Sequence, residues 1–202
     1  MNITIHTPAV HLHGGSTAAD VLKALASALT APPVSVEAAA DEPAAASTDA
    51  LVPGTYYSHE GGIYIGMMPA RGTVGAYHLF ASTTETKATF GPEVEIAGCA
   101  DHWDGPGNTA ALLASGKDHP AAKWCSQYSA DGKADWYLPA HAELALAWVV
   151  CAGSFNPESW YWSSTQYGRD FAWAQDFEYG TSDSFSLKDY GFRVRAFRRS
   201  FI

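Results

Sequence analysis

Charge, and positive charge above all, is scarce in this 202-residue sequence. Only 16% of the residues are charged, and 12 lysines and arginines stand against 21 acidic residues, for a net charge of −9. Binding of nucleic-acid phosphates requires a positive surface, so this balance excludes nucleic acid as the main partner. The sequence is nevertheless 47% hydrophobic, which is enough for a core and excludes a chain without a folded domain.

Cysteine is also scarce, and its placement excludes two common kinds of site. Cys99, Cys125 and Cys151 are too few and too widely spaced for a disulfide framework. They do not form the CxxC pairs that are typical of zinc ligands. Cys125 and Cys151 lie in helix-like stretches beside Ala and Trp, so we expect them to be buried free thiols.

Neither a targeting segment nor a membrane span is visible. The first residues, Met1 to His6, lack the basic and apolar regions of a signal peptide. No stretch contains the roughly 20 consecutive apolar residues that cross a bilayer. We therefore expect a protein that is made in a cytoplasm and is not inserted into a membrane.

The sequence divides into three sections. Residues 1–31 predict a short strand and one helix, in which Leu22, Leu25 and Leu29 form an apolar stripe. A lone amphipathic helix cannot bury such a stripe by itself, so we expect this section to anchor the chain on other subunits, with a homotrimer as the predicted arrangement. Residues 32–50 are rich in Ala and Pro and lack aromatic residues, which is typical of an extended linker.

The third section, residues 51–202, predicts an α+β domain. Two strands are expected at 61–68 and 77–81, with a turn between them. Two helices follow, one through Ala121 to Tyr128 and one between Pro139 and Gly153, each with apolar residues at i, i+3, i+4 and i+7. Short strands return from Trp160 onward. This order of elements predicts an α+β fold with two helices and short antiparallel strands.

The same section carries a specific string of motifs. They are Asp135-Trp136-Tyr137-Leu138-Pro139, Tyr161-Trp162-Ser163-Ser164-Thr165, Ala172-Trp173 and Arg193-Val194-Arg195. Together they resemble the Lcl-type C-terminal domain family of phage and bacterial surface proteins, over about residues 54–202. That family is related to the C-type-lectin fold, so the resemblance implies a C-type-lectin-like domain.

The resemblance also implies a binding protein rather than an enzyme. It points to a phage virion protein, such as a tail fibre or receptor-binding protein, whose partner is a host cell-surface protein or glycan. The N-terminal section would then join other virion subunits. Two other roles stay open: a structural decoration or head-fibre protein of the virion, and a ligand-binding protein displayed on a bacterial surface. The fold does not choose among them, because it hosts many functions.

Large aromatic residues define the expected core of this domain. We expect four tryptophans to be buried in the core: Trp136, Trp160, Trp162 and Trp173. Stacking on a sugar ligand is the alternative interpretation of these residues. Ser163 to Thr165 predict a turn whose hydroxyl groups bond to nearby backbone. A nucleophilic serine would need a positioned base, and no histidine follows His141, so a hydrolase is not expected.

The candidate ligand-binding residues lie between and after these tryptophans in the sequence. They are Tyr167, Gly168, Arg169, Asp170, Phe171, Asp176, Glu178, Tyr179, Thr181, Asp183, Ser184 and Phe185. These stretches show neither helical nor strand periodicity, and they mix Tyr and Arg, which anchor interfaces, with small polar residues that adapt around them. In the resembling proteins such positions are in some cases rewritten by a diversity-generating retroelement. Ordinary solvated loops are the alternative interpretation.

Two sets of residues offer metal ligands, although no cofactor is predicted. The oxygen ligands compatible with calcium are Asp101, Asp104, Asn108 and Asp131, without a set spacing. His11 and His13 share one face of a strand-like stretch, and three chains would bring six imidazoles together. Ordinary hydrogen-bonded side chains are the simpler interpretation of both sets.

Basic residues gather near the end of the chain, from Lys188 to Arg199. Such a patch suits RNA, but Arg193 and Arg195 alternate with apolar residues. The alternation predicts a half-buried strand in place of an RNA-binding surface.

Overall fold

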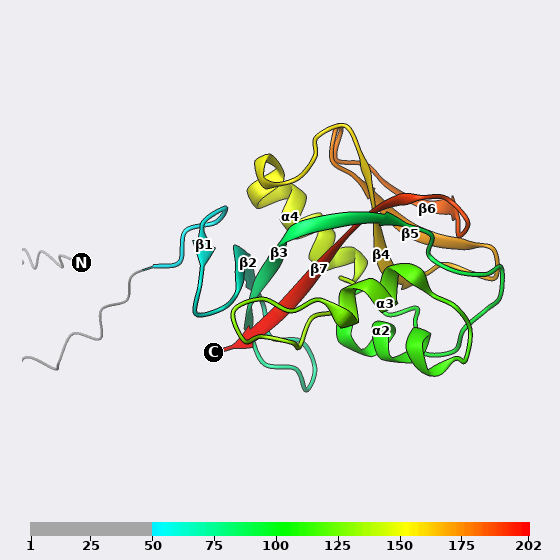
Figure 1. Ribbon diagram of the computed structural model, residues 1–202, viewed down its shortest axis with the longest axis horizontal. Coiled ribbons are helices and arrows are strands. Elements are labelled where there is room, and N and C mark those ends of the chain that lie inside the picture. The colour runs from blue at the N-terminus through cyan, green and yellow to red at the C-terminus, as the bar shows by residue number, and fades with distance from the viewer. Residues whose placement is uncertain (1–49) are drawn as a thin grey trace, which may run out of the picture. The chain divides into compact units, whose positions relative to one another are not determined.

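A single mixed sheet of seven strands organises the part of the chain that the computed structural model describes, residues 50–202 (Figure 1). The strands lie in the order β1-β2-β3-β7-β4-β5-β6, and the neighbours pair antiparallel except β4 and β7, which pair parallel. The strands are β1 (Tyr56–Tyr57), β2 (Gly62–Met68), β3 (Tyr77–Ala88), β4 (Trp160–Gln166), β5 (Phe171–Asp176), β6 (Ser182–Leu187) and β7 (Phe192–Phe201). The helices are α2 (Gly105–Ala114), α3 (Pro120–Gln127) and α4 (His141–Cys151), which continues into a short 3₁₀ turn, η1 (Ala152–Ser154). The expected α+β class is confirmed.

The central strands have apolar side chains on both faces, so the domain has two hydrophobic cores. In β7, Val194 and Ala196 pack with α2 and α3, whereas Phe197 packs with α4 on the other face. The same alternation places Tyr161 and Trp162 of β4 in different cores. Because successive side chains of a strand point to opposite faces, helices cover the sheet on both sides.

The number of helices and the length of two strands differ from the expectation. The region expected to contain one helix before residue 128 contains two, because Gly116 takes a left-handed φ of +70° and Pro120 then starts α3. Strands β3 and β7 contain 12 and 10 residues and are not short. They pair with each other along most of their length, which the apolar pattern of either segment alone does not reveal.

The predicted turn at Ser163 to Thr165 is wrong, because these residues are buried inside β4. Their hydroxyl groups donate to backbone groups of distant segments, although the Ser163 hydroxyl also accepts from the nearby Thr165 N–H at 3.2 Å. Ser163 donates to the carbonyl of Trp173 at 2.7 Å, and Thr165 donates to the carbonyl of Asp101 at 3.0 Å. A small hydroxyl side chain can therefore replace an apolar one in this strand without leaving a buried polar group unpaired.

The C-terminal basic segment is a strand, as expected, but its arginines are held inside the domain. Arg193 pairs with Glu85, and Arg198 pairs with Glu60 and Asp135. The Arg195 guanidinium donates to backbone carbonyls, including that of Ser82 at 2.7 Å. These guanidinium groups serve internal contacts, and Arg195 and Arg198 are buried.

The three cysteines are free and buried, as expected for Cys125 and Cys151. Burial raises the pKa of the Cys99 and Cys151 thiols to about 11, so both are protonated at neutral pH.

The predicted anchor at 1–31, its homotrimer and the His11/His13 pair lie outside the described residues, as does the linker at 32–50 apart from Ala50. Among the helices of residues 50–202, none is long and apolar enough to cross a membrane.

Candidate binding face

The twelve candidate ligand-binding residues do not form one surface. Strands β5 and β6 form a hairpin. Tyr167 to Phe171 lie at its open end, Asp176 to Thr181 lie at its turn, and Asp183, Ser184 and Phe185 lie along β6 between the two. The six residues from Phe171 to Asp176 span about 17 Å of extended strand. The expectation of irregular loops is also wrong for five of them, which lie in strands: Phe171, Asp176, Asp183, Ser184 and Phe185.

The turn between β5 and β6 is held by a buried side chain at its start and exposes a large side chain at its tip. Asp176 is buried, and its carboxylate accepts hydrogen bonds from the backbone N–H of Glu178 and of Tyr179. Gly180 has a left-handed φ of +74°, and any side chain there would collide with the Trp148 ring. Asp176 is therefore a turn-forming residue and not a ligand contact, whereas Tyr179 is 73% exposed.

The other end of the hairpin carries a cluster of six rings, which we call the aromatic face. It consists of Tyr167, Phe171, Trp173 and Phe185 together with His102 and His141. The rings of Tyr167 and Phe185 have centroids 5.1 Å apart, and both side chains are more than half exposed, at 52% and 60%. Trp173 was expected in the core, but it is only half-buried. It points to the face of the sheet opposite Ala172 and Ala174, which are core residues.

His141, at the first position of α4, covers Trp173. The two ring centroids lie 4.4 Å apart, and the His102 ring packs against the same indole at 5.2 Å. The Nδ1 atoms of His102 and His141 are 3.2 Å apart. Burial, and then the neighbouring His102, lowers the pKa of His141, so this imidazole is neutral at neutral pH.

The hydrogen bonds around His141 assign its tautomer. The Ser182 hydroxyl donates its one proton to Gln175 Oε1 at 2.7 Å, so it must accept from His141 Nε2 at 2.9 Å. His141 Nδ1 is then an acceptor, and His102 Nδ1–H donates to it. The direction of this chain is opposite to that of a nucleophilic serine, whose hydroxyl proton would go to the histidine. The contact between Ser182 and His141 therefore orients the ring and does not activate the serine.

Lys188, one of the basic residues near the end of the chain, holds the loop that carries Tyr167. Its ammonium group is fully buried and donates to three oxygens: the carbonyl of Val94 at 2.6 Å, the carbonyl of Arg169 at 2.7 Å and Gln166 Oε1 at 2.8 Å. Burial lowers the pKa of this lysine, and its partners are neutral oxygens. Its fixed position stabilises the backbone from Gln166 to Asp170.

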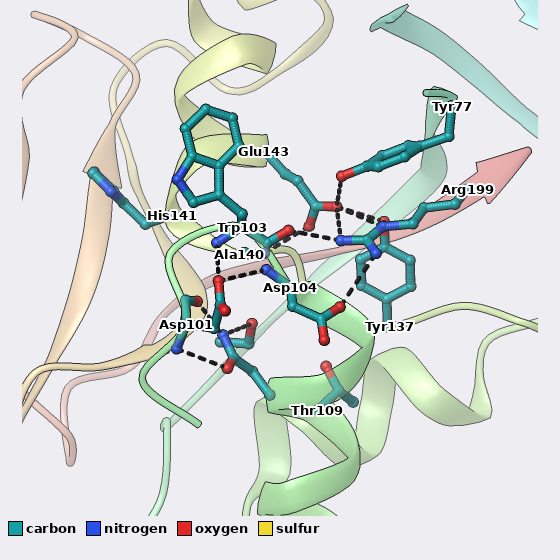
Figure 2. Close-up of polar contacts among 12 residues, drawn as sticks. Tyr77, Asp101, Trp103, Asp104, Thr109, Tyr137, Ala140, His141, Glu143 and Arg199 are labelled. Atoms are coloured by element: carbon teal, nitrogen blue, oxygen red, sulfur yellow. Dashed lines mark hydrogen bonds and ion pairs between the residues drawn. The ribbon is translucent and has the colours of Figure 1, made fainter. Parts of the chain in front are cut away.

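The loop that carries His102 is held by a second buried network, which Figure 2 shows around Glu143 and Arg199. Glu143 is fully buried, and its Oε1 accepts from the Arg199 guanidinium at 2.8 Å and from the hydroxyl groups of Tyr77 and Tyr137 at 3.0 and 2.9 Å. Its Oε2 accepts from the Ala140 N–H at 2.8 Å, which fixes the start of α4. Burial raises the pKa of Glu143, but every partner donates to it, so the carboxylate is the form that this network holds.

The same arginine reaches the loop before α2. Arg199 donates to Asp104 at 3.2 Å and to the carbonyl of Trp103 at 2.7 Å, and Asp101 accepts the N–H groups of Trp103 and Asp104. The aromatic face therefore rests on two polar networks that are buried or half-buried, and its rings are held in place before any ligand binds.

The residues considered as oxygen ligands of calcium form hydrogen bonds and ion pairs within the protein. Both side-chain atoms of the Asn108 amide bond within the protein, to the backbone of Asp101. Asp104 pairs with Arg199, and Asp131 accepts from Tyr56. Within residues 50–202, no group of three or more His, Cys, Asp or Glu side chains has the arrangement of a metal site.

His102, His141 and Lys188 are parts of the site that the residue pattern did not indicate, and Trp173 was expected first as a core residue. His141 directly follows the Leu138-Pro139-Ala140 segment at a helix start, which was the one available signal for its placement. Nothing in the sequence places His102 beside it, since 39 residues separate the two.

No family model matches the chain, and no curated protein matches it. Among solved structures, a fimbrial protein from Bacteroides ovatus ATCC 8483 is similar at a TM-score of 0.49 and 15% sequence identity. The similarity covers 61% of this chain and 36% of that chain, so this chain spans about a third of the fimbrial protein's length. A likeness this weak does not assign a function.

Proposed function

We propose that residues 51–202 form a C-type-lectin-like recognition domain of a phage virion protein, of the tail-fibre or receptor-binding type. In this proposal the domain binds a protein or glycan on the host-cell surface through the aromatic face. The chain would act as a binding protein and not as an enzyme. The string of motifs from Asp135 to Arg195 supports the family assignment.

The observation that carries the proposal is the exposed aromatic cluster at one end of the β5–β6 hairpin. Tyr167 and Phe185 are large, they contact each other, and they stand on a backbone that strands and Lys188 hold in place. Aromatic side chains lose little conformational entropy on binding and bury much apolar area, which makes them common anchors of interfaces. A soluble domain gains no stability from exposing them, so recognition is a reason for their position.

The arrangement of side chains on strands also suits a diversified surface. Phe171 projects from backbone that pairs with Leu187, and Trp173 and Phe185 lie in β5 and β6 where the register of the two strands shifts. Their identity can change while the flanking strand pairs remain. A reverse-transcriptase gene near this gene, with a second copy of the last hundred or so bases, would support diversification by a retroelement. The absence of both would leave a fixed receptor-binding surface.

The test measures binding of the full chain to a panel of intact bacterial cells and to a glycan array. Replacing Tyr167 and Phe185 together with serine should lower affinity by about a hundredfold, because each truncated anchor commonly costs 1–2 kcal/mol or more. Tyr179→Ser is the matched control, since Tyr179 is more exposed than either residue but lies at the other end of the hairpin.

Four outcomes decide among the proposed roles. Loss of binding in the double variant alone supports the aromatic face. Loss in Tyr179→Ser alone moves the site to the other end of the hairpin. Normal cell binding by all variants contradicts the aromatic face as the binding site. Binding only to purified virions, and not to cells, replaces receptor binding with the decoration or head-fibre role.

A further inference from the structure

A separate cavity of about 260 Å³ is lined by Trp103 and by Tyr77, a residue of the hydrophobic core. One wall is the turn between β2 and β3, with Arg71, and the start of β3, with Tyr77. The other is the loop of Asp101, Trp103 and Asp104. The cavity does not include the rings of the aromatic face, because the adjacent His102 packs against Trp173 instead.

The charges in this cavity are only partly neutralised. Arg199, which also lines the cavity, already forms ion pairs with Glu143 and Asp104. The Asp101 carboxylate accepts two backbone N–H groups at Oδ1. Among the described residues, Asp101 forms no ion pair. Asp101 therefore brings a negative charge to a cavity that the Trp103 ring also lines. A cavity that combines a carboxylate with an indole is a favourable environment for a cation.

A side chain of the protein already occupies this environment. The Arg71 guanidinium lies over the Trp103 ring, 4.5 Å from the ring centroid. Arg71 is exposed on a tight turn, where its backbone pairs with Val74 and Gly72 has a left-handed φ of +59°. Its side chain makes neither an ion pair nor a hydrogen bond within the described residues, so little besides the ring holds it there.

We propose that this cavity binds the ammonium group of a ligand against Trp103, with Asp101 as the countercharge and Arg71 as a displaceable internal occupant. The ammonium group is the shared chemistry of a choline headgroup, an amino sugar and a lysine side chain. Each is small enough for a cavity of this size. The site shares the loop of residues 101–104 with the aromatic face but does not rest on the proposed function of that face.

The experiment titrates the full chain with choline and, separately, with 3,3-dimethyl-1-butanol, which has the same shape without the charge. Calorimetry should detect choline and not the alcohol. Two further pairs of ligands are titrated in the same way: glucosamine with N-acetylglucosamine, and Nα-acetyl-lysine amide with its norleucine analogue. The charged ligand that binds most tightly among the three pairs identifies the source of the ammonium group. Equal binding of the charged and neutral members of all three pairs would overturn the proposal.

Two variants test the residues. Asp101→Asn keeps the oxygen that accepts the two N–H groups and removes the charge, so choline affinity should fall about fivefold or more. Arg71→Ala removes the internal competitor, so choline affinity should rise a few-fold. A fall in choline affinity in Arg71→Ala would contradict the proposal. Binding of acetate to the unmodified chain that is lost in Arg71→Ala would also contradict it, because it would show an anion site.

Lys123→Ala, on the exposed side of α3, is the control for a general change in charge and should bind choline normally. The Tyr167/Phe185 double serine variant should also bind choline normally. Failure of the cation site and failure of the receptor-binding face are therefore distinguishable in the same set of proteins.

Discussion

Arg199 Nη2 lies 2.8 Å from Glu143 Oε1, although 56 residues separate the two along the chain and the Glu143 side chain is fully buried. The pair joins β7, the central strand of the sheet, to the first turn of α4. Burying one of these charges without the other is costly, because the desolvated charge then has no countercharge.

Glu143→Gln should therefore lower the free energy of unfolding by about 3–5 kcal/mol, since it leaves the Arg199 guanidinium without its main partner. Urea unfolding measures the change. Arg169→Met removes an exposed ion pair with Asp170 and should cost at most about 1 kcal/mol. Similar costs for the two variants would show that the buried pair contributes no more than an exposed one.

Lys188→Met should release the loop that carries Tyr167 while it preserves the volume of the side chain. Three oxygens lose their donor, at about 1–3 kcal/mol for each that stays buried and unpaired. The amides of Tyr167 and Gly168, which bond to the carbonyl of Phe171, should then exchange hydrogen faster. Unchanged exchange at these two amides, with normal ligand binding, would show that Lys188 does not position the loop.

Replacing Trp162 and replacing Trp173 with leucine should have different effects on stability, although the sequence motifs predict the same buried position for both residues. Trp162 is fully buried, and its indole N–H donates to two carbonyls, so Trp162→Leu should cost about 3–5 kcal/mol of stability. Half-buried Trp173 supports the two histidine rings, so Trp173→Leu should cost less stability and should weaken ligand binding. Thermal unfolding and the cell-binding assay together check this contrast.

Stability should fall as the pH drops below 6.5. Burial lowers the pKa of His119, and burial together with the neighbouring His102 lowers that of His141, both from an ordinary value of 6.5. Below 6.5 the unfolded chain binds protons that the folded imidazoles do not, so protonation favours unfolding until the folded pKa is reached. Burial raises the pKa of Glu143, which acts in the opposite direction.

A substitution separates the histidine contribution from that of Glu143. In His141→Gln, the loss of unfolding free energy between pH 7.5 and pH 5 should be smaller than in the unmodified chain, as measured by urea unfolding at each pH. An identical pH dependence in the two proteins would show that His141 is not responsible for it.

The sequence by itself determined the α+β class, the helix from His141 to Cys151, the C-terminal strand and the burial of Cys125 and Cys151. These features follow from local periodicity, since apolar residues at helical or alternating spacing need only their neighbours in the chain to specify an element. The burial of Trp136 and Trp162 followed in the same way from their size and their place in the motifs.

Only the tertiary structure decided which polar residues are buried and which rings are exposed. Ser163 and Thr165 enter a strand because distant backbone groups, at Trp173 and Asp101, pair with their hydroxyl groups. Trp173 stays half-exposed because α4 starts beside it and reaches it with one histidine. Lys188 is buried because three segments far apart in the chain supply its acceptors. Such partners are set by strand order and by the packing of α4, and neither is encoded in the residues on either side of these positions.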